Sequence, residues 1–165
     1  MSDLSRVAQM VEERAAGLVL FARQWLDPAS AEDVVQEALT ALLMERRKPD
    51  NPIAWMYRAV HNSAIDCARS TSRRRRREQT AAMTRQEWFE STADSALDAK
   101  VAEAALRQLP AENRQVVVMR IWGELGFAQI AQIMHLGVAT VHERYVSALA
   151  QLRSALEKPC KNKMD

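Results

Sequence analysis

Apolar residues recur at helical spacing along most of the chain. Between residues 30 and 47, positions placed 100° apart put an apolar stripe on one side of a helix and polar residues on the other. The stripe consists of Val35, Ala38, Leu39 and Leu42. No alternating apolar run of useful length competes with this spacing, so we predict an all-α fold.

Cap and turn signals divide the first half of the chain into three helices. We predict them at residues 5–26, 30–47 and 51–69. Ser30 is a suitable N-cap for the second helix, and Asn51-Pro52 places a capping amide and a first-turn proline at the start of the third. The third helix leads into five consecutive arginines.

The second half of the chain contains a helix-turn-helix pattern. Residues 72–96 lose the apolar periodicity and are predicted to form a linker, in which only Trp88-Phe89 is expected to dock against the protein. Helices are then predicted at residues 97–108, 111–122, 127–135 and 138–157. A tight turn at Leu136-Gly137 joins the last two, which gives a short helix, a turn and a longer helix.

Composition narrows the class of protein. The 165 residues include only two cysteines, Cys67 and Cys160, too few for a disulfide framework or a metal cluster. No histidine has a cysteine or acid at ligand spacing, so neither a metal nor another cofactor is expected. No phosphate loop, catalytic carboxylate pair or Ser-His-Asp set is present. We expect a soluble cytoplasmic protein that does not insert into a membrane and is not an enzyme.

The charges are unevenly distributed along the chain. Residues 1–50 carry 6 basic and 9 acidic side chains, a net charge of −3, whereas residues 51–77 carry 7 and 1, a net charge of +6. The whole chain has a net charge of only +2. This asymmetry suggests an anionic partner at the basic block and a basic or polar partner near the N-terminus.

The helix predicted at residues 30–47 exposes a compact acidic patch opposite its apolar stripe. The patch is either an ordinary solvated face or a contact for a basic protein surface. Its residues are Asp33, Gln36, Glu37 and Thr40.

The helix predicted at residues 51–69 also has two contrasting faces. Its apolar face consists of Ile53, Met56, Tyr57, Val60, Ala64 and Cys67, with the cysteine as a small hydrophobe. The opposite face combines an aromatic ring, an amide and guanidinium groups, which can hold unstacked bases and phosphates. Trp55 belongs either to this face or to the core. The candidate residues are Trp55, Arg58, Asn62, Arg69, Arg73, Arg74, Arg75, Arg76 and Arg77.

The last predicted helix packs through one side and offers polar groups on the other. The packed side consists of Val141, Tyr145, Ala148, Leu149 and Leu152. The polar side could reach base edges or phosphates in a major groove, although a helical hairpin that contacts nothing has the same pattern. Its candidates are Thr140, His142, Glu143, Arg144, Ser147 and Gln151.

Three stretches together resemble a known family. They are AEDVVQEALTALL, PIAWMYRAVHNSAIDCARSTSRRRRR and LRQLPAENRQVVVMRIWGELGFAQIAQIMHLGVATVHERYVSALAQLRSAL. Their order and spacing are similar to those of bacterial sigma factors of the extracytoplasmic-function (ECF) group, over nearly the whole chain. The most specific features are a D-x-x-Q-E helix, an N-x-x-x-D-x-x-R helix and an L-P-x-x-x-R-x-V helix before the helix-turn-helix.

The resemblance implies two small helical domains joined by a flexible linker. Sigma region 2 would be a helical bundle at residues 1–72, followed by a basic and then acidic linker at 73–96. Sigma region 4 would hold the helix-turn-helix at 97–158, before a tail at 159–165. Such a factor binds core RNA polymerase and directs promoter recognition, DNA melting and transcription initiation. The implied partners are the polymerase core, through its β′ clamp helices and its β subunit, promoter DNA, and an anti-sigma factor or another regulator.

The resemblance also implies roles for the three faces. The acidic patch would bind the polymerase, the face of Trp55 with the arginines would bind the −10 element, and the face of Thr140 would bind the −35 element. The chain departs from the family at His142-Glu143, where a basic residue and a serine are frequent. Glu143 could accept a hydrogen bond from a cytosine amine or could repel phosphate. Gly126 replaces a frequent capping Ser or Thr, which predicts a weaker start for the short helix.

Two alternative functions remain at the level of sequence. The chain could be a helix-turn-helix regulator that binds duplex DNA tightly without polymerase, but such a protein does not need the acidic patch. It could instead be a sigma mimic that binds polymerase or an anti-sigma factor without recognising promoters. The altered −35 face is the main support for the mimic.

Overall fold

The computed structural model describes residues 2–78 and 104–161, with side chains for residues 2–77 and 104–157. These residues form helices and short connections without a strand, which confirms the all-α prediction. The expected docking of Trp88-Phe89 lies outside the described residues, as do most of the expected linker and the side chain of Cys160.

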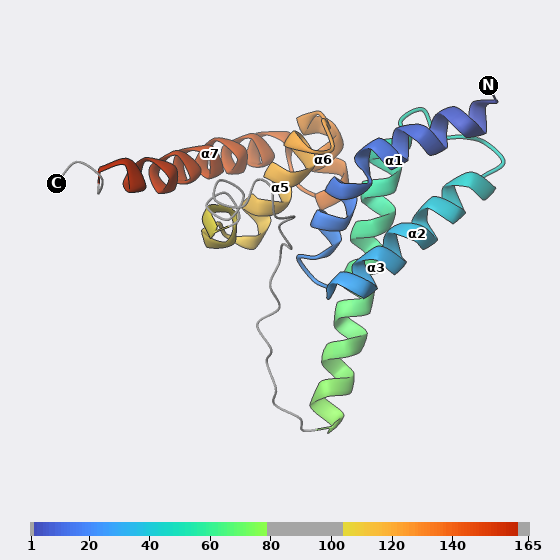
Figure 1. The fold of residues 1–165 in the computed structure, drawn as a ribbon, viewed down its shortest axis with the longest axis horizontal. Helices are drawn as coiled ribbons and strands as arrows, with labels where there is room; N and C mark the ends of the chain where they lie inside the picture. The colour runs from blue at the N-terminus through green and yellow to red at the C-terminus, as the bar shows by residue number, and fades with distance from the viewer. Residues whose placement is uncertain (1, 79–103, 162–165) are drawn as a thin grey trace.

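Three helices form the N-terminal unit, and each packs against the other two (Figure 1). They are α1 (Asp3–Ala22), α2 (Pro28–Met44) and α3 (Pro52–Glu78). The apolar stripe predicted for the second helix faces the inside of this bundle. Its members Val35, Ala38 and Leu42 are buried, and Leu39 is partly buried.

The starts of α2 and α3 are set by proline and by one capping amide. Asn51 Oδ1 accepts a hydrogen bond from the Ala54 backbone N–H at 2.9 Å, as expected for an N-cap at the start of α3. The prediction for α2 is wrong, because α2 begins at Pro28 and Asp27 occupies the N-cap position instead of Ser30. A proline has the φ angle of a first helical residue, so the helix can begin two residues earlier.

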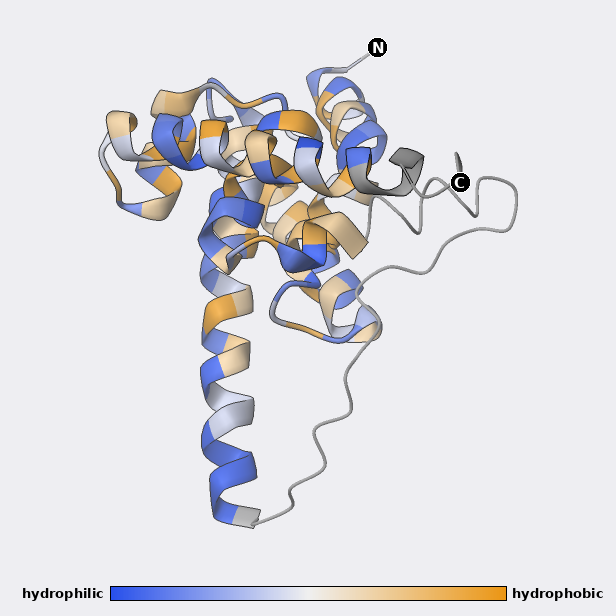
Figure 2. Ribbon diagram, turned by 90° about the vertical axis from the view of Figure 1, so that its left-hand side faces the viewer, coloured by the Kyte–Doolittle hydropathy of each residue, from blue (hydrophilic) through white to orange (hydrophobic). Residues whose placement is uncertain are grey.

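The third helix is longer than predicted. It runs to Glu78, so residues 73–77 are helical, whereas the helix was predicted to end at residue 69. Arginine is a good helix former, and its charge is favourable at the negative end of the helix dipole. The last turns extend away from the other helices and are strongly hydrophilic (Figures 1 and 2). Cys67 is exposed where this extension begins, so its predicted place on the apolar face is wrong.

The C-terminal unit contains the predicted helix-turn-helix. Its helices are α5 (Ala111–Ile121), α6 (Phe127–Met134) and α7 (Val138–Lys161), after a helical turn at residues 104–108. The left-handed residue of the turn between α6 and α7 is His135, with φ 55°, and not Gly137. At the start of α6, Gln129 Oε1 accepts a hydrogen bond from the Gly126 N–H at 3.0 Å, which caps the helix without a Ser or Thr.

The packed side of α7 largely follows the prediction. Val141 and Ala148 are buried, and Tyr145 and Leu152 are half-buried. Leu149 is 39% exposed, so its predicted packing is wrong. The helix extends beyond α5 and α6 (Figure 1), and its distal half has fewer neighbours to cover an apolar side chain.

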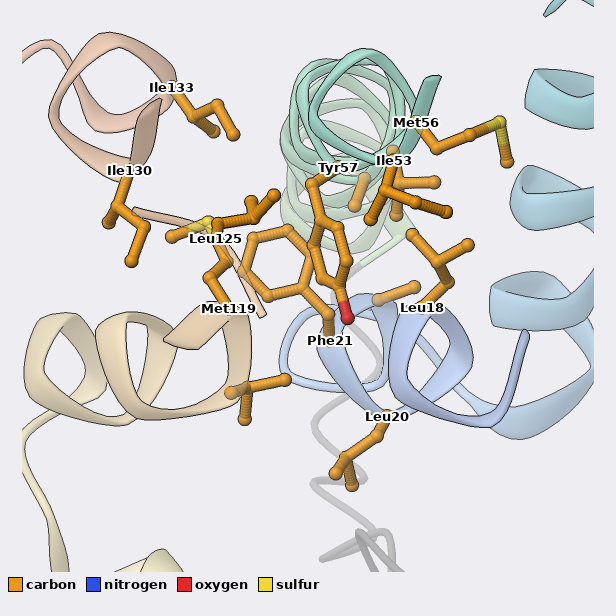
Figure 3. Packing of buried hydrophobic residues seen from close by; sticks show 14 of the residues in the cluster. Leu18, Leu20, Phe21, Ile53, Met56, Tyr57, Met119, Leu125, Ile130 and Ile133 are labelled. Carbon is orange, nitrogen blue, oxygen red and sulfur yellow. The ribbon is translucent and has the colours of Figure 1, made fainter. Parts of the chain in front are cut away.

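The two units share one hydrophobic core, which the sequence did not predict. Helix α1 contacts α5, and α3 contacts α6. Figure 3 shows Phe21 and Tyr57 of the N-terminal unit against Met119, Leu125 and Ile130 of the C-terminal unit. We call the contact surface formed by these five residues the seam. All five are at most 1% exposed, so the units are closely packed there.

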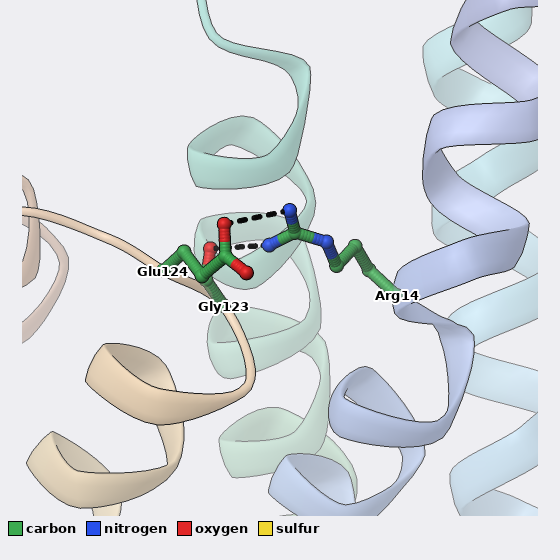
Figure 4. A network of polar contacts seen from close by, with 3 residues as sticks. All are labelled: Arg14, Gly123 and Glu124. Carbon is green, nitrogen blue, oxygen red and sulfur yellow. Dashed lines mark hydrogen bonds and ion pairs between the residues drawn. The ribbon is translucent and has the colours of Figure 1, made fainter.

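Polar contacts between the units flank the seam. The Arg14 guanidinium donates hydrogen bonds to the Gly123 carbonyl oxygen at 3.3 Å and to Glu124 Oε2 at 2.9 Å (Figure 4). Arg114 Nε donates to Gln24 Oε1 at 3.2 Å. The Glu124 side chain is 69% exposed, so its ion pair contributes little stability and mainly fixes the register of the two units.

Candidate functional sites

The acidic patch lies on the solvent side of α2. Asp33, Gln36, Glu37 and Thr40 are all exposed, while the opposite side of the same helix is buried. Spacings of three and four residues bring these side chains together on one face. The Thr40 hydroxyl donates to the Gln36 carbonyl oxygen at 3.0 Å, so the remaining polar groups are two carboxylates and an amide. Such a surface suits a cationic partner.

The polar face of α3 is exposed as predicted. Arg58, Asn62 and Arg69 are exposed, and Trp55 is half-buried against the core. The two interpretations of Trp55 are therefore each correct in part, because the indole packs on the core and still reaches the surface. An exposed amide between two guanidinium groups leaves room for a base and its phosphates.

The arginines at the end of α3 do not form a single surface. An open groove is lined by Asp66, Arg69, Ser72, Arg73 and Arg76. At 100° per residue, Arg74 and Arg75 point away from this groove. The helical conformation therefore separates the basic block into a groove-lining set and a set on other faces.

Not all of the polar side of α7 is available for contacts. The Arg144 guanidinium forms an ion pair with Glu112 of α5 and its side chain is only 23% exposed. The His142 ring meets the edge of the Phe127 ring at 5.3 Å between centroids. Glu143, Ser147 and Gln151 are exposed, and Gln151 donates to the Ser147 hydroxyl at 3.3 Å. Thr140 is half-buried.

Two buried titratable groups lie close to the seam. Burial raises the pKa of Tyr57, whose hydroxyl has no hydrogen-bond partner among the described residues. Burial also lowers the pKa of His61, and the nearby His135 acts in the same direction, whereas Asn62 opposes it. The His61 ring lies between 5.6 and 6.1 Å from the rings of Phe21 and Trp25.

His61 is expected to make stability depend on pH. Its pKa is lower in the folded than in the unfolded protein, so below pH 6.5 the unfolded state binds more protons and folding weakens as the pH falls. We expect the melting temperature to fall between pH 7.5 and 5, and His61→Phe to flatten this dependence. Thermal melts at several pH values measure it, with the exposed His142→Gln as control. Parallel curves for wild type and His61→Phe would contradict the assignment.

Sequence reasoning missed the contacts between the two units. Arg14, Gln24 and Glu124 were not candidates, because no local pattern pairs residues about a hundred positions apart. The available signals were Gly17 and Gly123, since a glycine within a helix or directly after one often marks a close approach.

The described residues contain no metal-binding group of three or more His, Cys, Asp or Glu side chains. Among the helices in this part of the chain, none combines the length and the apolar character needed to span a bilayer.

Comparison with known proteins identifies the two units. The family model described as Sigma-70 region 2 matches residues 10–75, and the one described as Sigma-70, region 4 matches residues 100–152. The ECF RNA polymerase sigma factor SigL of Mycobacterium tuberculosis, from strains H37Rv and CDC 1551, is 33% identical over 165 residues. The match covers 95% of this chain and 92% of that protein.

Solved structures with a similar fold extend over both units. The sigma factor RpoE from Bartonella quintana, in complex with the anti-sigma factor NepR, matches with a TM-score of 0.71 and 19% identity, over 91% of this chain and 96% of that one. CnrH, in complex with the cytosolic domain of CnrY, matches with a TM-score of 0.59 and 21% identity, over 92% and 88%. At these identities the likeness concerns the fold.

Proposed function

The chain belongs to the extracytoplasmic-function group of bacterial RNA polymerase sigma factors. From this premise we propose which of its exposed faces binds the polymerase and which faces bind promoter DNA. It is a promoter-recognition factor that binds core RNA polymerase. It acts in the cytoplasm and supplies recognition and strand separation, while the chemistry of RNA synthesis belongs to the polymerase.

The acidic patch of α2 docks on the β′ clamp helices of the polymerase. The observation that carries this proposal is the exposure of Asp33, Gln36 and Glu37 on one face of a helix whose other face is buried. Two carboxylates on a rigid helix can meet cationic side chains without reorganisation. The surface of the N-terminal unit remote from the patch is then left for DNA.

The polar face of α3 holds the −10 element. Asn62 and Trp55 are placed to hold an unstacked base, and the arginines that follow are placed to meet phosphates. Opening a stacked step costs a few kcal/mol, so a site for the freed base favours the melted state. Helix α7 enters the major groove of the −35 element with its exposed side, which includes Glu143 and Ser147.

A regulatory protein binds the sigma factor and keeps it inactive. Both similar solved structures contain a sigma factor with a partner: RpoE with an anti-sigma factor, and CnrH with the cytosolic domain of CnrY. We propose that this chain is likewise bound by an anti-sigma factor or a comparable protein. Its surface offers unpaired apolar side chains to such a partner, since Val146, Leu149 and Leu156 of α7 are 39–51% exposed.

Charge reversal in the acidic patch tests the proposal. Glu37→Arg is expected to weaken binding to core polymerase by roughly tenfold or more, because like charges would then face each other. Polymerase binding and promoter opening are measured together with bacterial core enzyme and promoter DNA. Glu45→Arg is the matched control, since Glu45 is an exposed carboxylate at the C-cap of α2, about two turns beyond Glu37.

The other outcomes separate the alternative functions. Polymerase binding by the wild type without promoter opening would favour a sigma mimic. Tight duplex binding by the chain alone, with no affinity for polymerase, would overturn the proposal in favour of an independent regulator.

A further inference from the structure

In the first half of α7, the arginine of the polar side is engaged by a neighbouring helix. Arg144 is paired with Glu112, and its side chain is three-quarters covered. A guanidinium that is held by a carboxylate of α5 and mostly covered has its charge compensated within the C-terminal unit and is poorly accessible to a base edge. Arg144 is therefore a positioning residue that fixes α7 on α5.

The remaining basic groups near the start of α7 are also engaged. His142 lies with its ring near the edge of Phe127. Arg120 lies over the same Phe127 ring, 4.7 Å from its centroid, and donates to the Leu125 carbonyl oxygen at 2.9 Å. These contacts place the His142 ring and the Arg120 guanidinium against Phe127 of the C-terminal unit.

What lies at the centre of the outward side is a carboxylate among apolar side chains. At 100° per residue, Ala139, Glu143, Val146 and Ala150 share one strip of α7, and all four are exposed. Glu143 has no hydrogen bond or ion pair with any other described residue that would turn it away from solvent. It lies in the second turn, within the part of a recognition helix that contacts base edges.

We propose that Glu143 selects a cytosine in the −35 element by accepting a hydrogen bond from its exocyclic amine, an inference that rests on the proposed role of α7. In the major groove cytosine presents an N4 amine donor, which a carboxylate can accept from. Guanine and thymine present acceptors at the corresponding edge, and adenine has its N7 acceptor beside its N6 amine, so each of these bases brings an acceptor that repels a carboxylate. On one side Glu143 is flanked by Ala139 and Val146, which cannot hydrogen-bond to a base. On the other side it is flanked by Thr140 and Ser147, of which Ser147 is engaged by Gln151, so Glu143 is the charged group that discriminates between bases.

The test is a selection of −35 sequences by the reconstituted holoenzyme. Promoters with a randomised −35 element are incubated with core polymerase and the sigma factor, and the sequences that form open complexes are counted. We expect cytosine at one position to be favoured by roughly tenfold over other bases with the wild type, and this preference to disappear with Glu143→Ala. Glu143→Gln is expected to move the preference toward adenine, which a glutamine amide can bind through N6 and N7.

The matched control is Glu157→Ala, which removes an exposed carboxylate near the other end of α7. It is expected to leave the preference unchanged. A uniform rise in affinity for all sequences with Glu143→Ala, at unchanged base preference, would overturn the inference, because Glu143 would then only repel phosphates. No open complexes with any sequence would instead contradict the proposed function, so the two failures are distinguishable.

Discussion

Gly17→Leu is expected to force the two helical units apart. A Cβ atom at position 17 of α1 would lie 2.7 Å from Trp122 Cβ and 2.9 Å from the Tyr57 hydroxyl oxygen. Neither neighbour is the free end of a flexible chain, because Trp122 Cβ is next to the backbone and Tyr57 is fully buried. Relief therefore requires the C-terminal unit, which carries Trp122, to move away and the Tyr57 ring to shift within the N-terminal unit.

The distance between the units, measured together with stability, distinguishes a packed seam from two independent units, because Tyr57 of the N-terminal unit crowds position 17 in both cases. Leucine is a better helix former than glycine by roughly 0.5–1 kcal/mol, so the substitution would stabilise α1 if nothing lay against it. Across the seam, overpacking is expected to cost about 2–3 kcal/mol and to dominate. We therefore expect a lower melting temperature and a longer distance between the units.

Two measurements check this result: a thermal melt, and the distance between spin labels placed on exposed positions of α2 and α7. Ala16→Leu is the matched control, because Ala16 is an exposed neighbour on the same helix. It adds a similar side chain without reaching the seam. An unchanged label distance together with a raised melting temperature for Gly17→Leu would show that the units are not packed in solution.

Helix periodicity predicted the fold class and most of the local packing. The stripe of α2 and the apolar face of α3 up to Ala64 are buried, because a repeat of 3.6 residues records which side faces a core. The prediction failed where the core ends. Cys67 continues the apolar repeat of α3, but from Asp66 to Arg77 every side chain of α3 except that of Ala68 is exposed, and the cysteine is exposed with them.

Charge density did not predict where α3 ends, nor which charged side chain forms an ion pair within the protein. Five arginines were interpreted as a linker because they lack apolar periodicity, yet they continue α3. Arg144 was interpreted as a DNA contact because it lies on the polar side of α7, yet it pairs with Glu112. The pairing with Glu112 could not be predicted, because a single helix considered alone does not show which partner another helix brings to it.

Arg73→Gln with Arg76→Gln is expected to weaken promoter binding by about 100-fold at low salt, if the groove at the end of α3 meets the phosphates of the −10 region. The groove is lined by these two arginines together with Arg69 and Asp66. A charge-assisted hydrogen bond to a phosphate contributes about 1.5 kcal/mol or more, which is roughly tenfold per arginine. The loss should be similar for all −10 sequences, because phosphates carry no sequence information.

The salt dependence of promoter binding shows whether the loss of affinity comes from lost phosphate contacts. A plot of the log of the promoter-binding constant against log salt has a negative slope, and each lost phosphate contact makes it shallower by about 0.9. The substitution of Arg73 and Arg76 together is therefore expected to make it shallower by about 1.8. Arg74→Gln with Arg75→Gln removes the same charge from faces that point away from the groove, and we expect a clearly smaller change. Titration of the holoenzyme with promoter DNA between 50 and 200 mM salt measures both pairs. Equal slopes for the two pairs would mean that the basic block acts only through its total charge, and that the helical end of α3 does not select which arginines meet the DNA.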